Sequence, residues 1–182
     1  MCRRVLRYLK GNIEYGLSYT PSSISLNAFC DSDWAGCPDD KKSTSGYGVF
    51  LGQNLISWSA MKQSVVSRSS IEAEYRFMAL DTAELYWLRM LMQELHVSLS
   101  SPPVLWCDNI GAIALASNPI FHARTKHVEV DYHFVRDKVV NRDIQVRYIS
   151  TQDQVADTFT KGQTAIRFNY LRSKLMVTLL PH

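Results

Sequence analysis

The fold of this chain depends on the stretch FCDSDWAG at residues 29–36, the acidic end of a strand. Ahead of it, apolar residues at 24, 26, 28 and 30 alternate with residues 25, 27 and 29, which predicts a strand over 24–33. The strand ends in Asp31 and Asp33, which are two residues apart and therefore point to the same side of the sheet. Carboxylates at the end of a largely apolar strand need a partner, and a metal ion is one such partner. A turn-forming role for Asp33 is the alternative.

The composition is that of an ordinary globular protein. With 182 residues, 46% hydrophobic and 20% charged, the chain suits one domain with a sizeable core. No apolar run reaches transmembrane length and no signal-peptide hydrophobic region follows the basic first ten residues, so no membrane partner is expected. The 4 cysteines show no CxxC spacing, which argues against a zinc site and favours a reducing, intracellular location, the cytoplasm ahead of the nucleus or an organelle.

The first half of the chain predicts an antiparallel meander followed by a long helix. A basic helix is expected over 2–10 and a short strand over 15–19. Strands over 24–33, 46–52 and 55–59 then follow each other with short connections, as in a meander. Apolar residues next recur at intervals of three and four, which predicts a helix from Ser69 to about residue 95, with Ser69 and Glu72 forming a capping box.

The second half alternates strands with helices. The expected elements are a strand over 104–107, helices over 111–117 and 128–140, a strand over 144–149, and helices over 154–161 and 164–175. A helical crossover normally returns the chain parallel to the previous strand. The predicted class is therefore α/β, with a mixed sheet of about five strands, an antiparallel meander and then parallel strands, flanked by helices.

Four acidic residues share one kind of position in this arrangement. Asp31 and Asp108 end strands, whereas Glu74 and Asp157 lie near the starts of helices. Strand ends and helix starts gather at one edge of such a sheet. Clustered carboxylates repel each other unless cations neutralise them, and hard oxygen ligands suit Mg²⁺ or Mn²⁺. A pair of such ions about 3.5–4 Å apart is the usual device for in-line displacement at a phosphodiester.

Seven short motifs carry a resemblance to a known family. They are DSDWAG at 31–36, KSTSGY at 42–47, ISW at 56–58, SSIEAEY at 69–75, CDN at 107–109, KHVEVDYHF at 126–134 and QVADTFTK at 154–161. In this order they resemble the ribonuclease H domain of copia-type long-terminal-repeat retrotransposon polyproteins. LRYLKG at 6–11 is similar to the connection that follows the reverse transcriptase, so the resemblance covers nearly the whole chain.

The resemblance implies a ribonuclease H-like fold. It also implies hydrolysis of the RNA strand of RNA–DNA hybrids with two Mg²⁺ ions, for which Mn²⁺ can substitute. The family's catalytic and metal-binding acids correspond to Asp31, Glu74, Asp108 and Asp157. The implied division is a basic helix and connection-like arm at 1–20, a ribonuclease H-like domain at 21–165, and a C-terminal helix and tail at 166–182. A reverse transcriptase domain of the parent polyprotein is a further implied partner.

Two of these acids have a competitor close by. The family's Asp-x-Asp pattern fits Asp31 or Asp33. Asp31 is favoured because it directly continues the strand, and Asp33 is the alternate. Glu72 competes with Glu74, but the capping box already gives Glu72 a structural role.

Small polar and basic residues near the acids are candidates for nucleic-acid contacts. Lys42, Ser43, Arg68, Ser70 and Asn109 have the chemistry to bind phosphates or ribose 2′-hydroxyls, or alternatively to cap helices and form turns. A histidine near such a site assists proton transfer or product release, which makes His122 a further candidate.

Two alternatives to an active nuclease remain open at this point. One is an RNA- or hybrid-binding module that has lost catalysis, and the other is a structural remnant that supports a reverse transcriptase. The chain contains no Tyr-x-Asp-Asp, so it is not expected to synthesise DNA by itself.

Overall fold

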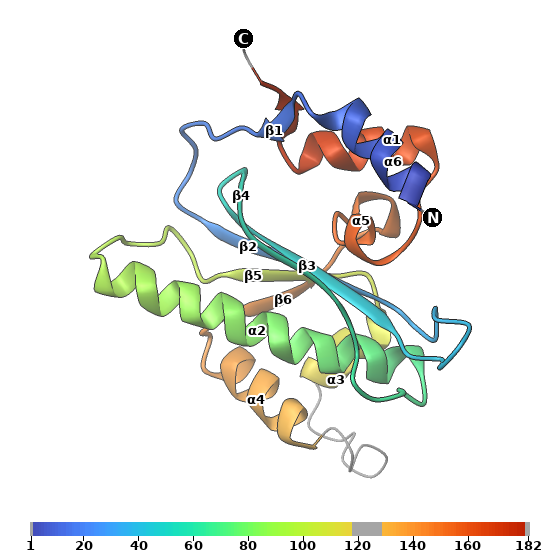
Figure 1. Ribbon diagram of the computed structural model, residues 1–182. Coiled ribbons are helices and arrows are strands. Elements are labelled where there is room, and N and C mark those ends of the chain that lie inside the picture. Colours follow the sequence, from blue (N-terminus) through green and yellow to red (C-terminus); the bar gives the residue numbers. More distant parts are fainter. Residues whose placement is uncertain (1, 118–128, 181–182) are drawn as a thin grey trace.

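A five-stranded mixed sheet forms the centre of the computed structural model, which describes residues 2–117 and 129–180 (Figure 1). Its strands are β2 (Leu26–Asp33), β3 (Thr44–Leu51), β4 (Asn54–Lys62), β5 (Val104–Cys107) and β6 (Gln145–Tyr148). The spatial order is β4-β3-β2-β5-β6, with β2, β3 and β4 antiparallel and β5 and β6 parallel to β2. The predicted class, and the change from antiparallel to parallel pairing, are confirmed.

Helices cover both faces of this sheet. On one side lie α2 (Ser70–Glu94), α3 (Ile110–Ser117) and α4 (Glu129–Val140), and on the other α5 (Asp157–Thr160) and α6 (Ala165–Lys174) (Figure 1). The alternation of β2 explains the two layers, since Ala28 and Cys30 are buried in the core against α2 whereas Phe29 packs with the cluster around α5. None of the helices in these two described ranges is long and apolar enough to cross a bilayer.

The long helix α2 begins where the capping pattern predicts. The Ser69 hydroxyl accepts a hydrogen bond from the Glu72 backbone N–H at 3.1 Å. The Glu72 carboxylate reaches back to the Arg68 N–H at 3.0 Å, one residue before the cap, and pairs with Arg76 one turn later. The first bond satisfies a free N–H group of the first turn, and the two bonds together fix the point at which α2 starts. Glu74 lies immediately beyond this fixed start.

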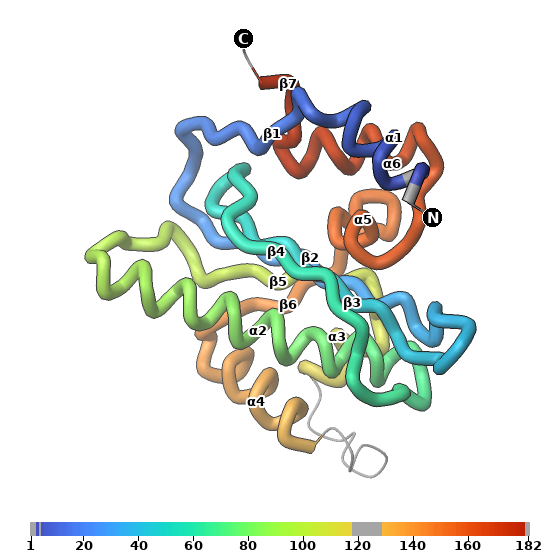
Figure 2. Tube along the Cα trace, viewed as in Figure 1, coloured from blue at the N-terminus to red at the C-terminus, as the bar shows by residue number. Residues whose placement is uncertain are grey.

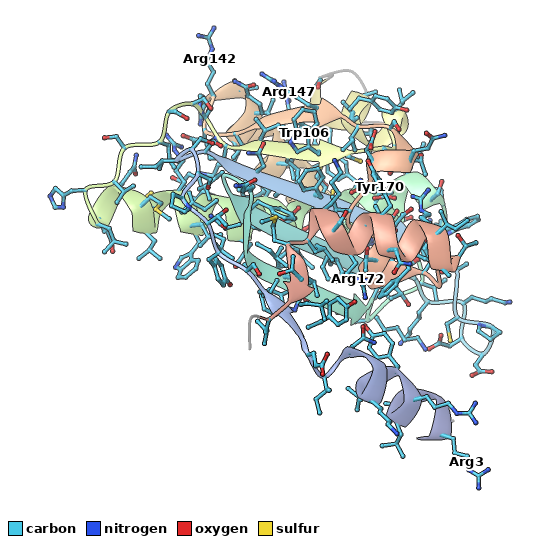
Figure 3. The ribbon with its side chains drawn as sticks, turned by 90° about the horizontal axis from the view of Figure 1, so that it is seen from above. Arg3, Trp106, Arg142, Arg147, Tyr170 and Arg172 are labelled. Carbon is cyan, nitrogen blue, oxygen red and sulfur yellow. The ribbon has the colours of Figure 1, made fainter. Side chains whose placement is uncertain are left out.

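The two ends of the chain form a small unit of their own. β1 (Tyr15–Leu17) pairs antiparallel with β7 (Val177–Leu179) (Figure 2). α1 (Cys2–Asn12) contacts α6 through the rings of Tyr8 and Phe168, whose centres lie 6.3 Å apart. Arg172 projects from α6 (Figure 3). Its guanidinium carbon lies over the ring of Tyr15, 4.2 Å from the ring centre. The sequence did not predict β7, because three residues with a partner far along the chain carry no local signal. The division at residues 20 and 166 stays a prediction.

Two predicted elements differ from the observed ones by more than two residues at an end. The helix expected over 154–161 is a 3-10 turn, η2 (Thr151–Asp153), followed by the single turn of α5. Gln154 lies between them, fully buried, and its side-chain amide donates to the carbonyl oxygen of Cys30 at 2.9 Å. This bond ties the segment to β2, which explains why it does not continue as one regular helix. The strand expected over 55–59 extends to Lys62.

Gly46 lets α5 lie directly on β3, and its replacement gives a prediction about stability. A Cβ on Gly46 would be 2.5 Å from Phe159 Cβ and 3.2 Å from Thr160 Cγ2. Gly46→Ala is therefore expected to lower the free energy of unfolding by about 1–3 kcal/mol, because α5 must move off the sheet. Chemical denaturation measures this change. The matched control is Gly11→Ala in α1, whose Cβ would meet nothing within 4 Å. It should leave stability unchanged or raise it by up to about 1 kcal/mol, because alanine favours a helix over glycine. Equal effects of the two substitutions would contradict this account of the packing.

Candidate active site

Two aspartates come level with each other at the carboxyl ends of neighbouring parallel strands. The register of β2 and β5 pairs Phe29 with Trp106. Two residues further along each strand, the chain reaches Asp31 and Asp108. Asp31 is only 2% exposed, whereas Asp108 is partly exposed and accepts a hydrogen bond from the Thr151 hydroxyl at 2.8 Å. The sheet itself therefore brings these two predicted acids together.

Glu74 completes a group of three carboxylates at this edge. One oxygen each from Asp31, Glu74 and Asp108 lies within 4.8 Å of the others. Glu74 is 5% exposed, and its Oε1 accepts a hydrogen bond from the Ser32 N–H at 3.2 Å. Its Oε2 is buried and has no hydrogen-bond partner. A buried acceptor without a partner is costly unless a proton or a cation satisfies it.

Asp157 joins the group through a lysine. The Lys161 Nζ lies 3.2 Å from Asp31 Oδ1 and 2.8 Å from Asp157 Oδ1, and so links the two carboxylates. Arg167 of α6 pairs with the other oxygen of Asp157, Oδ2. Asp157 is 2% exposed, so its charge is balanced by these two cations in the protein interior.

Several positioning residues around the acids were not anticipated from the sequence. Thr160 donates a hydrogen bond to Asp31 Oδ2, and Thr151, Lys161 and Arg167 hold Asp108 and Asp157 as described above. Lys161 had a usable signal, because it follows Asp157 by four residues, the spacing of a helical ion pair. Arg167 and Thr151 had none, since their partners are brought near only by the fold.

Burial and mutual repulsion shift the proton affinities of the acids. The pKa of Glu74 is raised from 4.5 to about 10, chiefly by burial, with Cys107 and Asp31 adding to the rise. Burial also raises the pKa of Asp31 to about 6, while the Thr160 hydroxyl and the Lys161 charge limit the increase. Partial burial opposes protonation of Lys161, but its hydrogen bond to Asp157 and the nearby Asp31 charge raise its pKa overall. The site thus favours bound cations or protons.

The competing acids have other contacts. Asp33 Oδ2 lies 2.1 Å from the position that a Cβ on Gly36 would take, so its side chain folds over the turn after β2. Glu72 is engaged in the cap of α2, with Arg68 and Arg76. Glu72 thus has a structural role in the cap, and neither Glu72 nor Asp33 belongs to the three-carboxylate group.

The predicted nucleic-acid contacts differ in exposure. Arg68 and Ser70 are exposed at the start of α2, and Lys42 is partly exposed. Ser43 is fully buried and its hydroxyl accepts a hydrogen bond from the Ala35 N–H at 3.3 Å, so it holds the loop after β2. Asn109 caps α3, since its Oδ1 accepts from the Ala112 N–H at 3.1 Å. His122 lies outside the described residues.

The three-carboxylate group fits a hard divalent cation. All of its donors are carboxylate oxygens, which Mg²⁺ and Mn²⁺ prefer. The unpartnered Glu74 Oε2 and the raised pKa values of Glu74 and Asp31 are the features expected where a cation normally balances the charge.

The sheet order, with acids at the carboxyl ends of β2 and β5 and at the start of α2, defines a ribonuclease H-like domain. Solved structures with this fold include LC11-RNase H1 in complex with an RNA/DNA hybrid, with a TM-score of 0.54 at 10% identity over 75% of this chain and 94% of the other. The N-terminal ribonuclease H domain of a Mycobacterium tuberculosis protein gives a TM-score of 0.54 at 11% identity over 83% and 98%. At these identities the likeness establishes the fold alone.

The sequence relationships are much closer. The chain is 47% identical over 180 residues, 98% of its length, to the retrovirus-related Pol polyproteins from transposons RE1 and RE2 of Arabidopsis thaliana. It is 38% identical over 157 residues, 86% of its length, to that from transposon TNT 1-94 of Nicotiana tabacum. It spans about 12% of the length of each polyprotein. No protein-family model matches. The resemblance to copia-type retrotransposon Pol polyproteins that the motifs carry is thus confirmed over nearly the whole chain, together with the ribonuclease H-like fold.

Proposed function

We propose that this domain is a ribonuclease H-type hydrolase that cleaves the RNA strand of RNA–DNA hybrids. The observation that carries the proposal is the group of three carboxylate oxygens within 4.8 Å of one another, one of them on a buried residue with an unpartnered oxygen. The family relationship and the neighbour solved with an RNA/DNA hybrid support the same substrate. We assign catalytic and metal-binding roles to Asp31, Glu74, Asp108 and Asp157.

Divalent ions, Mg²⁺ or Mn²⁺, would supply activation of the attacking water and charge stabilisation at the scissile phosphate. The work of the chain is to hold its carboxylates in place. The Ser32 N–H orients Glu74, the Thr160 hydroxyl orients Asp31, and the Thr151 hydroxyl orients Asp108. Carboxylates fixed by such hydrogen bonds lose little freedom when a substrate and its ions bind.

Recognition of the hybrid is assigned to the surface beside the acids. Arg68, Ser70 and Lys42 are the exposed or partly exposed candidates there, with basic groups for phosphates and a hydroxyl for ribose. Within the parent polyprotein the natural partner of such a domain is the reverse transcriptase, which produces RNA–DNA hybrids.

Cleavage of four labelled substrates by the purified chain tests this proposal. The substrates are an RNA–DNA hybrid, double-stranded RNA, single-stranded RNA and double-stranded DNA of one sequence. The RNA of the hybrid alone should be cut, with Mg²⁺ present and not with a chelator. A folded protein that binds the hybrid without Mg²⁺ and never cuts it would instead be a binding module that has lost catalysis.

The raised pKa values predict how pH affects stability. A carboxyl whose pKa is higher in the folded state contributes stability fully below its unfolded pKa and loses it as pH rises through the folded value. For Asp31 this loss runs from 3.8 to about 6, and for Glu74 from 4.5 to about 10. The contribution of these two groups should therefore make the metal-free protein less stable at pH 8 than at pH 5. Mg²⁺ should restore stability at the higher pH.

Thermal unfolding with and without Mg²⁺ measures this effect. At about 100 times its dissociation constant, an ion stabilises by about 2.7 kcal/mol, which raises the Tm of a domain of this size by about 5 °C or more. We expect this increase at pH 8 and little of it at pH 5, where protons compete for the same oxygens. An equal increase in Tm at both pH values would show that the ion binds elsewhere.

A further inference from the structure

The ammonium of Lys161 lies between two buried carboxylates of the proposed site. Its Nζ is 3.2 Å from Asp31 Oδ1 and 2.8 Å from Asp157 Oδ1, and both aspartate side chains are at most 3% exposed. The second oxygen of each aspartate is already engaged, by the Thr160 hydroxyl and by the Arg167 guanidinium. The two free oxygens therefore face one cation, which the chain itself supplies.

The Lys161 ammonium can move away from the two aspartates into solvent. The Lys161 side chain is 36% exposed, although the carboxylates that it contacts are buried. The residue follows the last turn of α5, and the next residue is Gly162, around which a Cβ would meet nothing within 4 Å. The long, flexible stem of a lysine can thus carry its charge into solvent without disturbing the packing of α5.

The ammonium of Lys161 lies where a divalent ion held between Asp31 and Asp157 would lie. Asp31 belongs to the three-carboxylate group and also to the lysine bridge. A divalent ion held by both Asp31 and Asp157 would compete with Lys161 for the oxygens that it contacts, because Thr160 and Arg167 engage the other two. Two cations at one pair of oxygens repel each other strongly where water is excluded.

On the basis of the proposed function, we propose that Lys161 is an intramolecular counter-ion of the metal-free site, which a divalent ion must displace in order to bind. It neutralises Asp31 and Asp157 before the ion arrives and weakens the apparent affinity for the ion. A purely structural lysine, bracing α5 through its pair with Asp157, would not oppose metal binding.

Titration of the metal-free chain with Mn²⁺ alone, followed by the electron paramagnetic resonance of free Mn²⁺, tests the inference. Lys161→Met is expected to bind Mn²⁺ roughly tenfold more tightly than the wild type, equivalent to about 1.4 kcal/mol. Lys62→Met is the matched control, because Lys62 pairs with Asp40 at 2.9 Å on the surface. Its Mn²⁺ affinity should equal that of the wild type.

Thermal unfolding gives a second readout that a structural role would not produce. Without metal, Lys161→Met should unfold at a lower Tm than the wild type, because Asp31 and Asp157 lose the cation that they share, although Asp157 retains its pair with Arg167. With saturating Mn²⁺ the difference should vanish or reverse. A variant that is equally destabilised with and without Mn²⁺, and whose affinity is unchanged or weaker, would overturn the inference while leaving the proposed function intact. If neither protein binds Mn²⁺, both proposals fail.

Discussion

Replacing Asp31 by asparagine is expected to reduce cleavage of the RNA strand by about 10²–10³-fold, the loss typical of removing one preorganised electrostatic group. Asp31 belongs to both parts of the proposed site, the three-carboxylate group and the lysine bridge to Asp157. Asparagine keeps the shape of the side chain and an oxygen that can accept the Thr160 hydrogen bond. The loss should therefore come from the missing charge, with the protein still folded.

Asp33→Asn is the matched control, because it removes the same charge two residues away on the same strand. Its side chain folds over the turn at Gly36 and lies outside the three-carboxylate group, so cleavage should remain close to that of the wild type. Single-turnover rates on a labelled hybrid, with circular dichroism as the check of folding, make the comparison. A larger loss for Asp33→Asn than for Asp31→Asn would exchange the roles of the two aspartates.

Replacing Glu74 by glutamine is expected to move activity and stability in opposite directions. Cleavage should again fall by about 10²–10³-fold, because a metal-binding charge is lost. The metal-free protein should become more stable at pH 8 by about 1–3 kcal/mol, since keeping Glu74 protonated there, or burying its charge, no longer costs free energy. Its raised pKa, about 10, gives the sign, and the gain should shrink towards pH 5. Active sites commonly sacrifice stability in this way.

Urea denaturation at pH 5 and pH 8, without metal, measures this gain. Glu72→Gln is the control, because Glu72 caps α2 and pairs with Arg76 on the partly exposed side of the helix. The free energy of unfolding of Glu72→Gln should fall by a few tenths of a kcal/mol to about 1 kcal/mol, and its cleavage activity should be retained. If Glu74→Gln were destabilised at pH 8 as well as inactive, its carboxylate would be a structural group that is satisfied without a metal.

The central part of the fold was accessible from sequence because its signals are local. The alternation of β2, the cap at Ser69 and the apolar spacing of α2 each lie within a short window. The prediction that strand ends and helix starts meet at one edge then needed only the rule for helical crossovers. Asp31, Glu74 and Asp108 do meet there, and their catalytic roles stay predictions.

What the sequence left open depends on contacts between distant segments. The pairing of β1 with β7 joins residues more than 150 positions apart, as the match of Tyr15 with Leu179 shows. The absence of side chains on β3 at Gly46 decides where α5 lies, and no periodic pattern reveals that. Arg167 reaches Asp157 only because α6 folds back over α5. The last two features set the surroundings of the site, and all three arise from tertiary packing alone.

The most direct test of the account follows the RNA strand of an RNA–DNA hybrid, labelled at its 5′ end, during incubation with the purified chain and Mg²⁺. We expect cuts within the RNA that leave 3′-hydroxyl and 5′-phosphate ends and that stop when the metal is chelated. Asp108→Asn, the negative control, should produce no cuts. Intact RNA after incubation with folded wild-type protein, or equal cleavage by Asp108→Asn, would contradict the account.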